Sequence, residues 1–281
     1  MIAVLLALGG ALSYGVSDFI GGLMSRRAAL WPTALTACMG ALVGTVVLAL
    51  LHPGNPSGEH FAWAVMSGVG NGVGTGFLYR GMAAGRMAVA APVSAIGSAA
   101  LPVLAGIIAG ERPGAIVWVG IAFAFPAIWL VASEASDAEG KAQTDGPTGA
   151  LDGIVAGLGF GASFAALGQI PDRAGYWPLT AAQVIAIAAV IATCYLMGGS
   201  PWPRTPAECV GAVSGLLASL AIWLFLLATH HGMLTVSSVV VSLYPAATVV
   251  LAITLLREHV HRAQAIGLAL CAMTVALVAL G

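Results

Sequence analysis

Long apolar runs follow one another along the chain from Ile2 to Leu280. A membrane-spanning helix takes roughly 17 to 25 mostly apolar residues, because the hydrocarbon core is about 30 Å thick. The pattern therefore predicts an all-α polytopic membrane protein with transmembrane helices near residues 2–23, 32–51, 61–81, 87–109, 114–133, 150–170, 178–198, 208–230, 234–256 and 260–280. Gly and Pro inside these runs fit helices in lipid, where neighbouring helices satisfy freed backbone groups.

Most polar breaks between the runs are short, with one exception. Residues 134–149 form a stretch that is acidic and contains Gly and Pro, which is typical of a flexible linker. The linker separates residues 1–133 from residues 150–281, and each of these segments holds five predicted helices.

The two halves resemble each other at a nearly constant offset. Glu111 aligns with Glu258 at an offset of 147 residues, and an offset of 146 places Tyr14-Gly-Val-Ser17 on Phe160-Gly-Ala-Ser163. An odd number of helices in each repeat gives the two repeats opposite membrane orientations, the design of many secondary transporters. The pattern thus predicts two inverted five-helix repeats and alternating access.

Composition supports a membrane location. Hydrophobic residues make up 59% of the chain and charged residues 7%, whereas soluble domains carry roughly 25% charged residues. The net charge is -1, and the longest run of basic residues is Arg26-Arg27, so we expect no nucleic-acid partner. The expected partners are the lipid bilayer and a small-molecule substrate, with the protein acting as a monomer or a homodimer.

Motifs for cofactor, metal and nucleotide chemistry are missing. The four cysteines lie far apart without CxxC spacing, so neither a disulfide framework nor a zinc site is expected. Without a GxxxxGK[ST] loop, ATP is not the expected energy source, and we expect no cofactor. An intramembrane enzyme remains an alternative, although GxSxG and HExxH motifs are absent. A non-transporting sensor or scaffold is another, although no stretch is long and polar enough for a soluble output domain.

Asp18 is the sharpest candidate for function, because it lies well inside the first predicted span. An ionised side chain near the centre of a membrane helix costs about 2.5–3.5 kcal/mol, which suggests a proton-coupling or substrate-amine site. A structural hydrogen bond or ion pair is the alternative. Arg80, near the end of the third span, is the expected partner of Asp18 or a ligand for an anionic substrate; it also fits an interfacial arginine.

Further side chains are candidates for a small-molecule pocket. They offer hydroxyl groups, an amide and aromatic walls: Tyr14, Ser17, Asn71, Tyr79, Ser94, Ser163, Trp223, Ser242 and Tyr244. Pro92 and Pro245 are candidates for helix hinges, because proline frees backbone carbonyls. Each set has a structural alternative, such as a serine bonded to its own helix or a tryptophan at the membrane interface.

Other patterns favour structural roles. Glycines repeat at four-residue spacing in two rows, which predicts close helix packing: Gly68, Gly72, Gly76 and Gly153, Gly157, Gly161. Glu111 and Glu258 occupy equivalent places in the repeats, and we expect them to cap a neighbouring helix or form an interfacial ion pair. His230-His231 fits interfacial solvation better than a metal site.

Several motifs together resemble the EamA family of the drug/metabolite transporter superfamily. They are Ser13-Tyr-Gly-Val-Ser-Asp-Phe-Ile-Gly-Gly22, Phe77-Leu-Tyr-Arg-Gly81, Gly110-Glu-Arg-Pro113, and Ser242-Leu-Tyr-Pro245 followed by Glu258. The resemblance covers both repeats. It implies ten helices, a cavity between the halves, and transport of amino acids, related metabolites or drugs, often as export. We expect an integral membrane protein of a bacterial inner or plasma membrane.

Basic residues in the predicted loops leave the orientation open. Those on the side opposite the termini are Arg26, Arg27, Arg86, Lys141, Arg204, Arg257 and Arg262, against Arg112 and Arg173 on the other side. The positive-inside rule therefore places both termini outside, whereas the family resemblance implies both inside. An even number of spans predicts that the two termini share one side.

Overall fold

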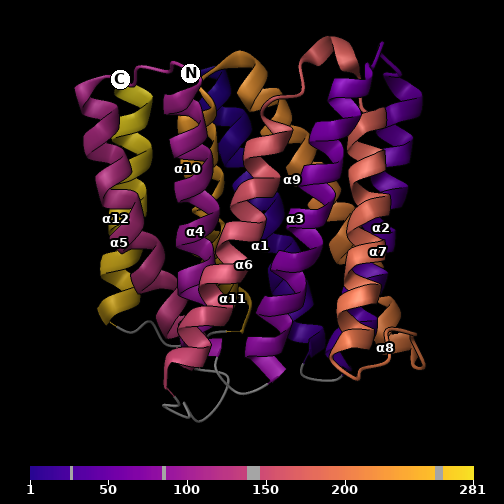
Figure 1. Cartoon of the computed structure of the whole chain (residues 1–281). Coiled ribbons are helices and arrows are strands. Elements are labelled where there is room, and N and C mark those ends of the chain that lie inside the picture. Colours follow the sequence, from indigo (N-terminus) through magenta and orange to yellow (C-terminus); the bar gives the residue numbers. More distant parts are fainter. Residues whose placement is uncertain (26–27, 84–86, 138–145, 257–261) are drawn as a thin grey trace.

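The computed structural model describes residues 1–25, 28–83, 87–137, 146–256 and 262–281 (Figure 1). The regular elements in these ranges are helices. In chain order they are α1 (Ile2–Ser25), α2 (Leu30–Leu51), α3 (Gly58–Ala83), α4 (Met87–Ile108), α5 (Ala115–Asp137), α6 (Gly146–Leu167), the 3-10 turn η1 (Asp172–Ala174), α7 (Trp177–Leu196), α8 (Pro206–Cys209), α9 (Gly211–His231), α10 (Leu234–Val241), α11 (Tyr244–Leu256) and α12 (Arg262–Leu280).

Each of the ten predicted spans corresponds to helical structure, with α8 and α9 sharing one span and α10 and α11 another. Within the described ranges, nine segments are long and apolar enough to cross a membrane. The remaining long helix, α3, has 26 residues but is less hydrophobic. Both termini lie on the same face, as an even number of spans requires (Figure 1). The protein is therefore an all-α polytopic membrane protein.

The helices that flank the predicted linker extend into it. α5 continues to Asp137 and α6 begins at Gly146, so both enter the range 134–149. Residues 138–145 fall outside the described ranges. The apolar pattern marks only the part of a helix that lies in lipid, whereas the backbone hydrogen bonds of a helix continue into water, so hydropathy underestimates both helices.

The two halves pack through each other's helices. α3 packs on α6 and α7, and α9 packs on α1 and α2. A side chain at Gly68 of α3 would collide with the Ala182 carbonyl of α7, and one at Gly215 of α9 would collide with the Ala37 carbonyl of α2. Gly215 follows Gly68 at the offset of 147 residues that aligns the repeats. Equivalent glycines thus form equivalent crossings, as two inverted repeats require.

The two glycine rows pack as the sequence predicts. Cβ atoms at Gly68, Gly72 and Gly76 would overlap Ala182, Ala189 and Thr193 of α7. Cβ atoms at Gly153, Gly157 and Gly161 would meet residues 90–101 of α4. Because lipid is as apolar as the helices, close backbone approach supplies much of the attraction between them. The prediction of close packing is therefore confirmed.

The ninth span is broken between α10 and α11. Pro245 has no N–H group, and beside it Leu243 N bonds to Val240 O at 3.2 Å in a tight turn. Pro92, by contrast, lies inside the continuous helix α4. The structure thus shows a bend site at Pro245, while hinge motion at either proline stays a prediction.

Glu111 caps the helix that precedes this break. Its Oε1 accepts a hydrogen bond from Leu234 N at 2.5 Å, and its Oε2 accepts one from Thr235 N at 2.8 Å. A carboxylate at a helix N-terminus satisfies free N–H groups and complements the helix dipole. The predicted capping role of Glu111 is confirmed, whereas Glu258 lies outside the described residues.

Candidate functional site

A cavity of about 270 Å³ lies between the two repeats. Its wall contains residues of α1, α2, α3, α4, α6, α7, α9 and α11. Six side chains that the sequence singles out line it: Tyr14, Ser17, Asp18, Asn71, Ser163 and Tyr244. Small-molecule sites typically measure about 300–1,000 Å³, so this cavity suits a small ligand.

Asp18 is the one carboxylate among the described residues of the cavity wall, and it is exposed to the cavity. Within the described part of the chain it receives no hydrogen bond and forms no ion pair. None of the described lining residues is Lys, Arg or His. Tyr14 precedes Asp18 by four residues on α1, so the two side chains lie on the same face of that helix. The carboxylate is therefore available to a proton or to a positively charged ligand.

Two serine pairs join the helices around the cavity. Ser17 Oγ of α1 lies 2.8 Å from Ser214 Oγ of α9, and Ser163 Oγ of α6 lies 2.9 Å from Ser67 Oγ of α3. Ser163 follows Ser17 by 146 positions, and Ser214 follows Ser67 by 147. The pairs are thus equivalent under the repeat symmetry, and the cavity they flank lies at the interface of the repeats.

Aromatic rings form a cluster on the cavity wall. Tyr14 meets Phe164 edge to face, with ring centroids 6.2 Å apart, and lies 5.9 Å from Tyr244. Phe164 in turn packs on Phe225 at 4.9 Å. These rings belong to α1, α6, α11 and α9, so the cluster connects both repeats. We call Tyr14, Phe164 and Tyr244 the aromatic cluster.

The cavity departs from repeat symmetry in its polarity. The equivalent of Asp18 at an offset of 146 is Phe164, and the equivalent of Asn71 at 147 is Ala218. All four residues line the cavity. The first repeat thus contributes a charge and an amide where the second contributes apolar groups, and the site has a polar side and an apolar side.

Arg80 does not pair with Asp18. Its Nε donates a hydrogen bond to Asp152 Oδ1 at 2.8 Å, its Nη2 bonds to the same oxygen, and the guanidinium lies 4.2 Å from the centre of the Phe77 ring. The reason is the helix arrangement, because α3 packs mainly on α6 and α7. The predicted pairing of Arg80 with Asp18 is therefore wrong, and Arg80 is not among the residues lining the cavity.

The sequence does not reveal Asp152 as the partner of Arg80, because Asp152 lies near the start of its apolar run and so looks like a residue at the membrane edge. α6 begins at Gly146, and the Asp152 side chain is only 1% exposed, against 39% for Arg80. A carboxylate and an arginine 72 residues apart form no recognisable motif. The pair joins α3 to α6 on the face opposite the chain termini (Figure 1).

Other predicted site residues lie outside the cavity wall. Ser94 is buried and bonds back to Ala91 O of its own helix. Ser242 is buried, and its hydroxyl has no hydrogen-bond partner in the described structure. Trp223 bonds to a residue on the loop side, as described below. The side chain of Tyr79 lies outside the described part of the chain. The geometry of the three described residues, Ser94, Ser242 and Trp223, does not support a pocket role.

Several lining residues escape sequence reasoning. Examples are Cys38, Ser67, Thr75, Phe160, Phe164, Gln183 and Ser214. Gln183 carries a usable signal, since it is the one amide in the apolar run 178–198. Phe160 also carries one, because it is the repeat equivalent of Tyr14. The remaining serines and threonines resemble the many others in the chain and cannot be selected without a structure.

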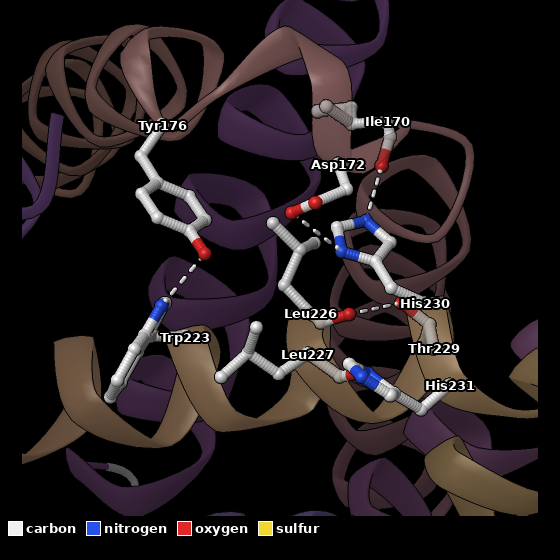
Figure 2. Close-up of polar contacts among 9 residues, drawn as sticks. All are labelled: Ile170, Asp172, Tyr176, Trp223, Leu226, Leu227, Thr229, His230 and His231. Atoms are coloured by element: carbon white, nitrogen blue, oxygen red, sulfur yellow. Dashed lines mark hydrogen bonds and ion pairs between the residues drawn. The ribbon is translucent and has the colours of Figure 1, made fainter. Parts of the chain in front are cut away.

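Several polar contacts join the loop between α6 and α7 to helix α9. They lie on the same face of the protein as the chain termini. Figure 2 shows Trp223 Nε1 donating a hydrogen bond to the Tyr176 hydroxyl at 2.9 Å. Burial raises the pKa of that hydroxyl, so it stays protonated. His230 Nε2 lies 2.9 Å from Ile170 O and Nδ1 lies 3.5 Å from Asp172 Oδ1. We call Ile170, Asp172, Tyr176, Trp223 and His230 the latch.

The protonation of His230 follows from its partners. A carbonyl oxygen only accepts, so Nε2 carries a hydrogen and donates to Ile170 O. Nδ1 lies 3.5 Å from Asp172 Oδ1, beyond a normal hydrogen bond, and has no hydrogen-bond partner in the described structure. His231 instead contacts Leu227 O of its own helix and is exposed (Figure 2). Of the two histidines, only His230 is thus seen to connect α9 to the loop.

Comparisons with known proteins agree with this architecture. The sequence profile of the EamA-like transporter family matches residues 1–133 and 147–280. A solved structure titled "Crystal structure of protein" has a TM-score of 0.75 and 16% identity, over 99% of this chain and 96% of its own, a likeness that shows a shared fold. No curated protein sequence matches. The chain belongs to the EamA-like transporter family, and is thus a membrane transporter of the drug/metabolite transporter superfamily.

Proposed function

We propose that the chain is a secondary transporter that binds a small metabolite, such as an amino acid, a related compound or a drug, in the central cavity. The observation that carries this proposal is the unpaired Asp18 carboxylate in a cavity walled by both repeats. Inverted-repeat transporters bind substrate at the repeat interface near the membrane midplane. An ionisable group at such a place is a functional site by default. We further propose export across a bacterial inner membrane.

Proton coupling is part of the proposal, with Asp18 as the carrier. The other titratable side chains on the described cavity wall are Tyr14, Tyr244 and Cys38, and no cationic side chain lies among them. A carboxylate without a fixed counter-ion alternates readily between a bound proton and a bound substrate. Binding of a proton on one side of the membrane and its release on the other would then drive substrate in the opposite direction.

Alternating access requires that the cavity be closed toward one face of the membrane while it is open to the other. The latch closes the cavity on the face of the chain termini. At an offset of 147, the repeat equivalents of Trp223 and His230 are Gly76 and Ala83. These small residues cannot form the hydrogen bonds of the latch. Among the described residues, the latch contacts on the face of the chain termini thus have no counterpart at these two equivalent positions, and opening this face requires the latch to separate.

Replacing Trp223 with Phe should shift the protein toward the state that is open on the latch face. The change removes one neutral hydrogen bond, worth about 1 kcal/mol, so we expect that population to rise about fivefold. Cys38 lines the cavity and reports the opening. Its labelling by a membrane-impermeant thiol reagent, applied from each side in turn, measures the shift after Ser replaces the other cysteines, Cys194, Cys209 and Cys271.

Trp202 offers a matched control, because its Nε1 donates an equal 2.9 Å hydrogen bond to the Tyr195 hydroxyl at an exposed place away from the latch. Trp202→Phe should leave Cys38 labelling unchanged from both sides. Equal labelling in the Trp223 and Trp202 variants would show that the latch does not gate the cavity.

Transport itself is tested by comparing metabolites inside and outside cells with and without the protein. We expect at least one small metabolite to accumulate outside only when the protein is present, and an uncoupler to reduce that flux several-fold. Purified protein in liposomes should then move the same compound in the direction opposite to the proton flow that an imposed pH gradient drives. Identical metabolite profiles would contradict transport, whereas flux that ignores the pH gradient would remove proton coupling alone.

A further inference from the structure

We propose that the cavity takes a small amphipathic organic ammonium ion, with its charge beside Asp18 and its apolar body against the aromatic cluster. This inference rests on the proposed function, because it names the substrate class of the same cavity. Three features support it: the sign of the charge on the wall, the aromatic rings, and the uneven polarity of the two repeats.

The charge of the wall selects a cation. Asp18 has no partner in the described structure, and no Lys, Arg or His is found among the described lining residues. An anionic ligand would meet repulsion, and a neutral ligand could offer the carboxylate only an uncharged hydrogen-bond donor, which binds more weakly than a cation. A zwitterion would place its own carboxylate in a cavity that offers it hydroxyl and amide groups but no cation, so it would bind less favourably than an ammonium ion. An ammonium group satisfies Asp18 with a charge-assisted hydrogen bond.

The aromatic cluster provides a second favourable interaction for the same ligand. Tyr14 contacts both Phe164 and Tyr244, with centroid distances of 6.2 and 5.9 Å, and it precedes Asp18 by four residues on the same face of α1. Aromatic faces attract cations within about 6 Å. Rings and carboxylate therefore favour one charge sign in one part of the cavity.

The uneven polarity of the repeats makes the ligand amphipathic. Phe160 and Phe164 of the second repeat occupy the places of Tyr14 and Asp18 of the first, and Ala218 occupies that of Asn71. A ligand with one polar end and one apolar end satisfies both sides. The volume of about 270 Å³ lies just below the usual range of small-molecule sites, about 300–1,000 Å³, which suits a single ring with a short chain.

Phenethylammonium, phenethyl alcohol and phenylacetate are matched probes of nearly equal size that differ in charge. Their binding to the purified full chain in detergent is measured by calorimetry, without any transport step. We expect the ammonium ion to bind about tenfold to a hundredfold more tightly than the alcohol, and the carboxylate to bind most weakly. Asp18→Asn should remove this preference, whereas Thr254→Val, on the exposed side of α11, should keep it.

The comparison on the unmodified chain decides the question even if Asp18→Asn fails to fold. Equal affinity for the ammonium ion and the alcohol, a preference for phenylacetate, or no ammonium binding up to millimolar concentration would overturn the inference. An Asp18→Asn variant that folds and keeps the preference would do the same. Binding of the ammonium ion without its movement into liposomes would support the ligand class and contradict transport. Transport of another metabolite without ammonium binding would support transport and overturn the ligand class.

Discussion

Asp18→Asn should reduce transport by about tenfold to a hundredfold while the protein still inserts and folds. Asn has almost the same shape as Asp but carries no charge and binds no proton. A hydrogen bond to a charged group is worth about 1.5–3 kcal/mol, which gives this range of rates. Because Asp18 forms no ion pair within the described structure, its replacement breaks no structural contact. Flux of the identified substrate into liposomes measures the effect.

The same variant should also lose any response to the pH gradient, since the proposed proton carrier is gone. Asp18→Glu should keep part of both activities, because it retains the carboxylate. Glu59→Gln is a matched control, since Glu59 is an exposed carboxylate in the first turn of α3. Flux at the wild-type level in a folded Asp18→Asn protein would exclude Asp18 from the mechanism.

Arg80→Gln should lower the free energy of unfolding by about 2–3 kcal/mol, an effect on stability more than on substrate binding. The change removes the cation that pairs with Asp152, whose side chain is 1% exposed. Breaking a buried ion pair from one side costs about 3–5 kcal/mol, and the partial exposure of Arg80 reduces that figure. Thermal unfolding of the purified protein in detergent, followed by circular dichroism, measures the change.

Asp152→Asn tests the asymmetry of the pair. The Arg80 side chain is 39% exposed and can reach water, so removing the carboxylate should cost less than removing the cation. The double variant, Arg80→Gln with Asp152→Asn, should be more stable than Arg80→Gln alone, because no charge is left buried. If the Arg80→Gln protein unfolds like the wild type but binds substrate weakly, Arg80 takes part in substrate binding and its role is not structural.

The fold was largely open to prediction from the sequence. Apolar runs marked the spans because burial in lipid requires them, and the offsets of 146 and 147 residues revealed the repeats. The ends of α5 and α6 were less predictable, since a helix continues into water where hydropathy no longer follows it. The lower hydropathy of α3 comes from its glycines and its polar residues, of which Asn71 and Thr75 line the cavity.

The site was predictable only in part. Asp18 stood out because a charge inside an apolar run is costly, and Tyr14, Ser17 and Ser163 were candidates because they offer hydroxyl groups to a pocket. Trp223 was expected in the pocket but lies in the latch, because its indole N–H finds the Tyr176 hydroxyl on a loop. No local pattern connects these two residues, which lie 47 positions apart.

The sequence by itself determined the ten spans, the two inverted repeats and the place of one membrane-embedded carboxylate. Only the tertiary structure decided which helix lies beside which, and so paired Arg80 with Asp152 and left Asp18 in the cavity without a partner among the described residues. The physical reason is that lipid and protein interior are equally apolar, so helix faces toward either look alike in sequence. Partners in this fold are chosen by backbone approach at glycines such as Gly68 and Gly215, which becomes visible only in three dimensions.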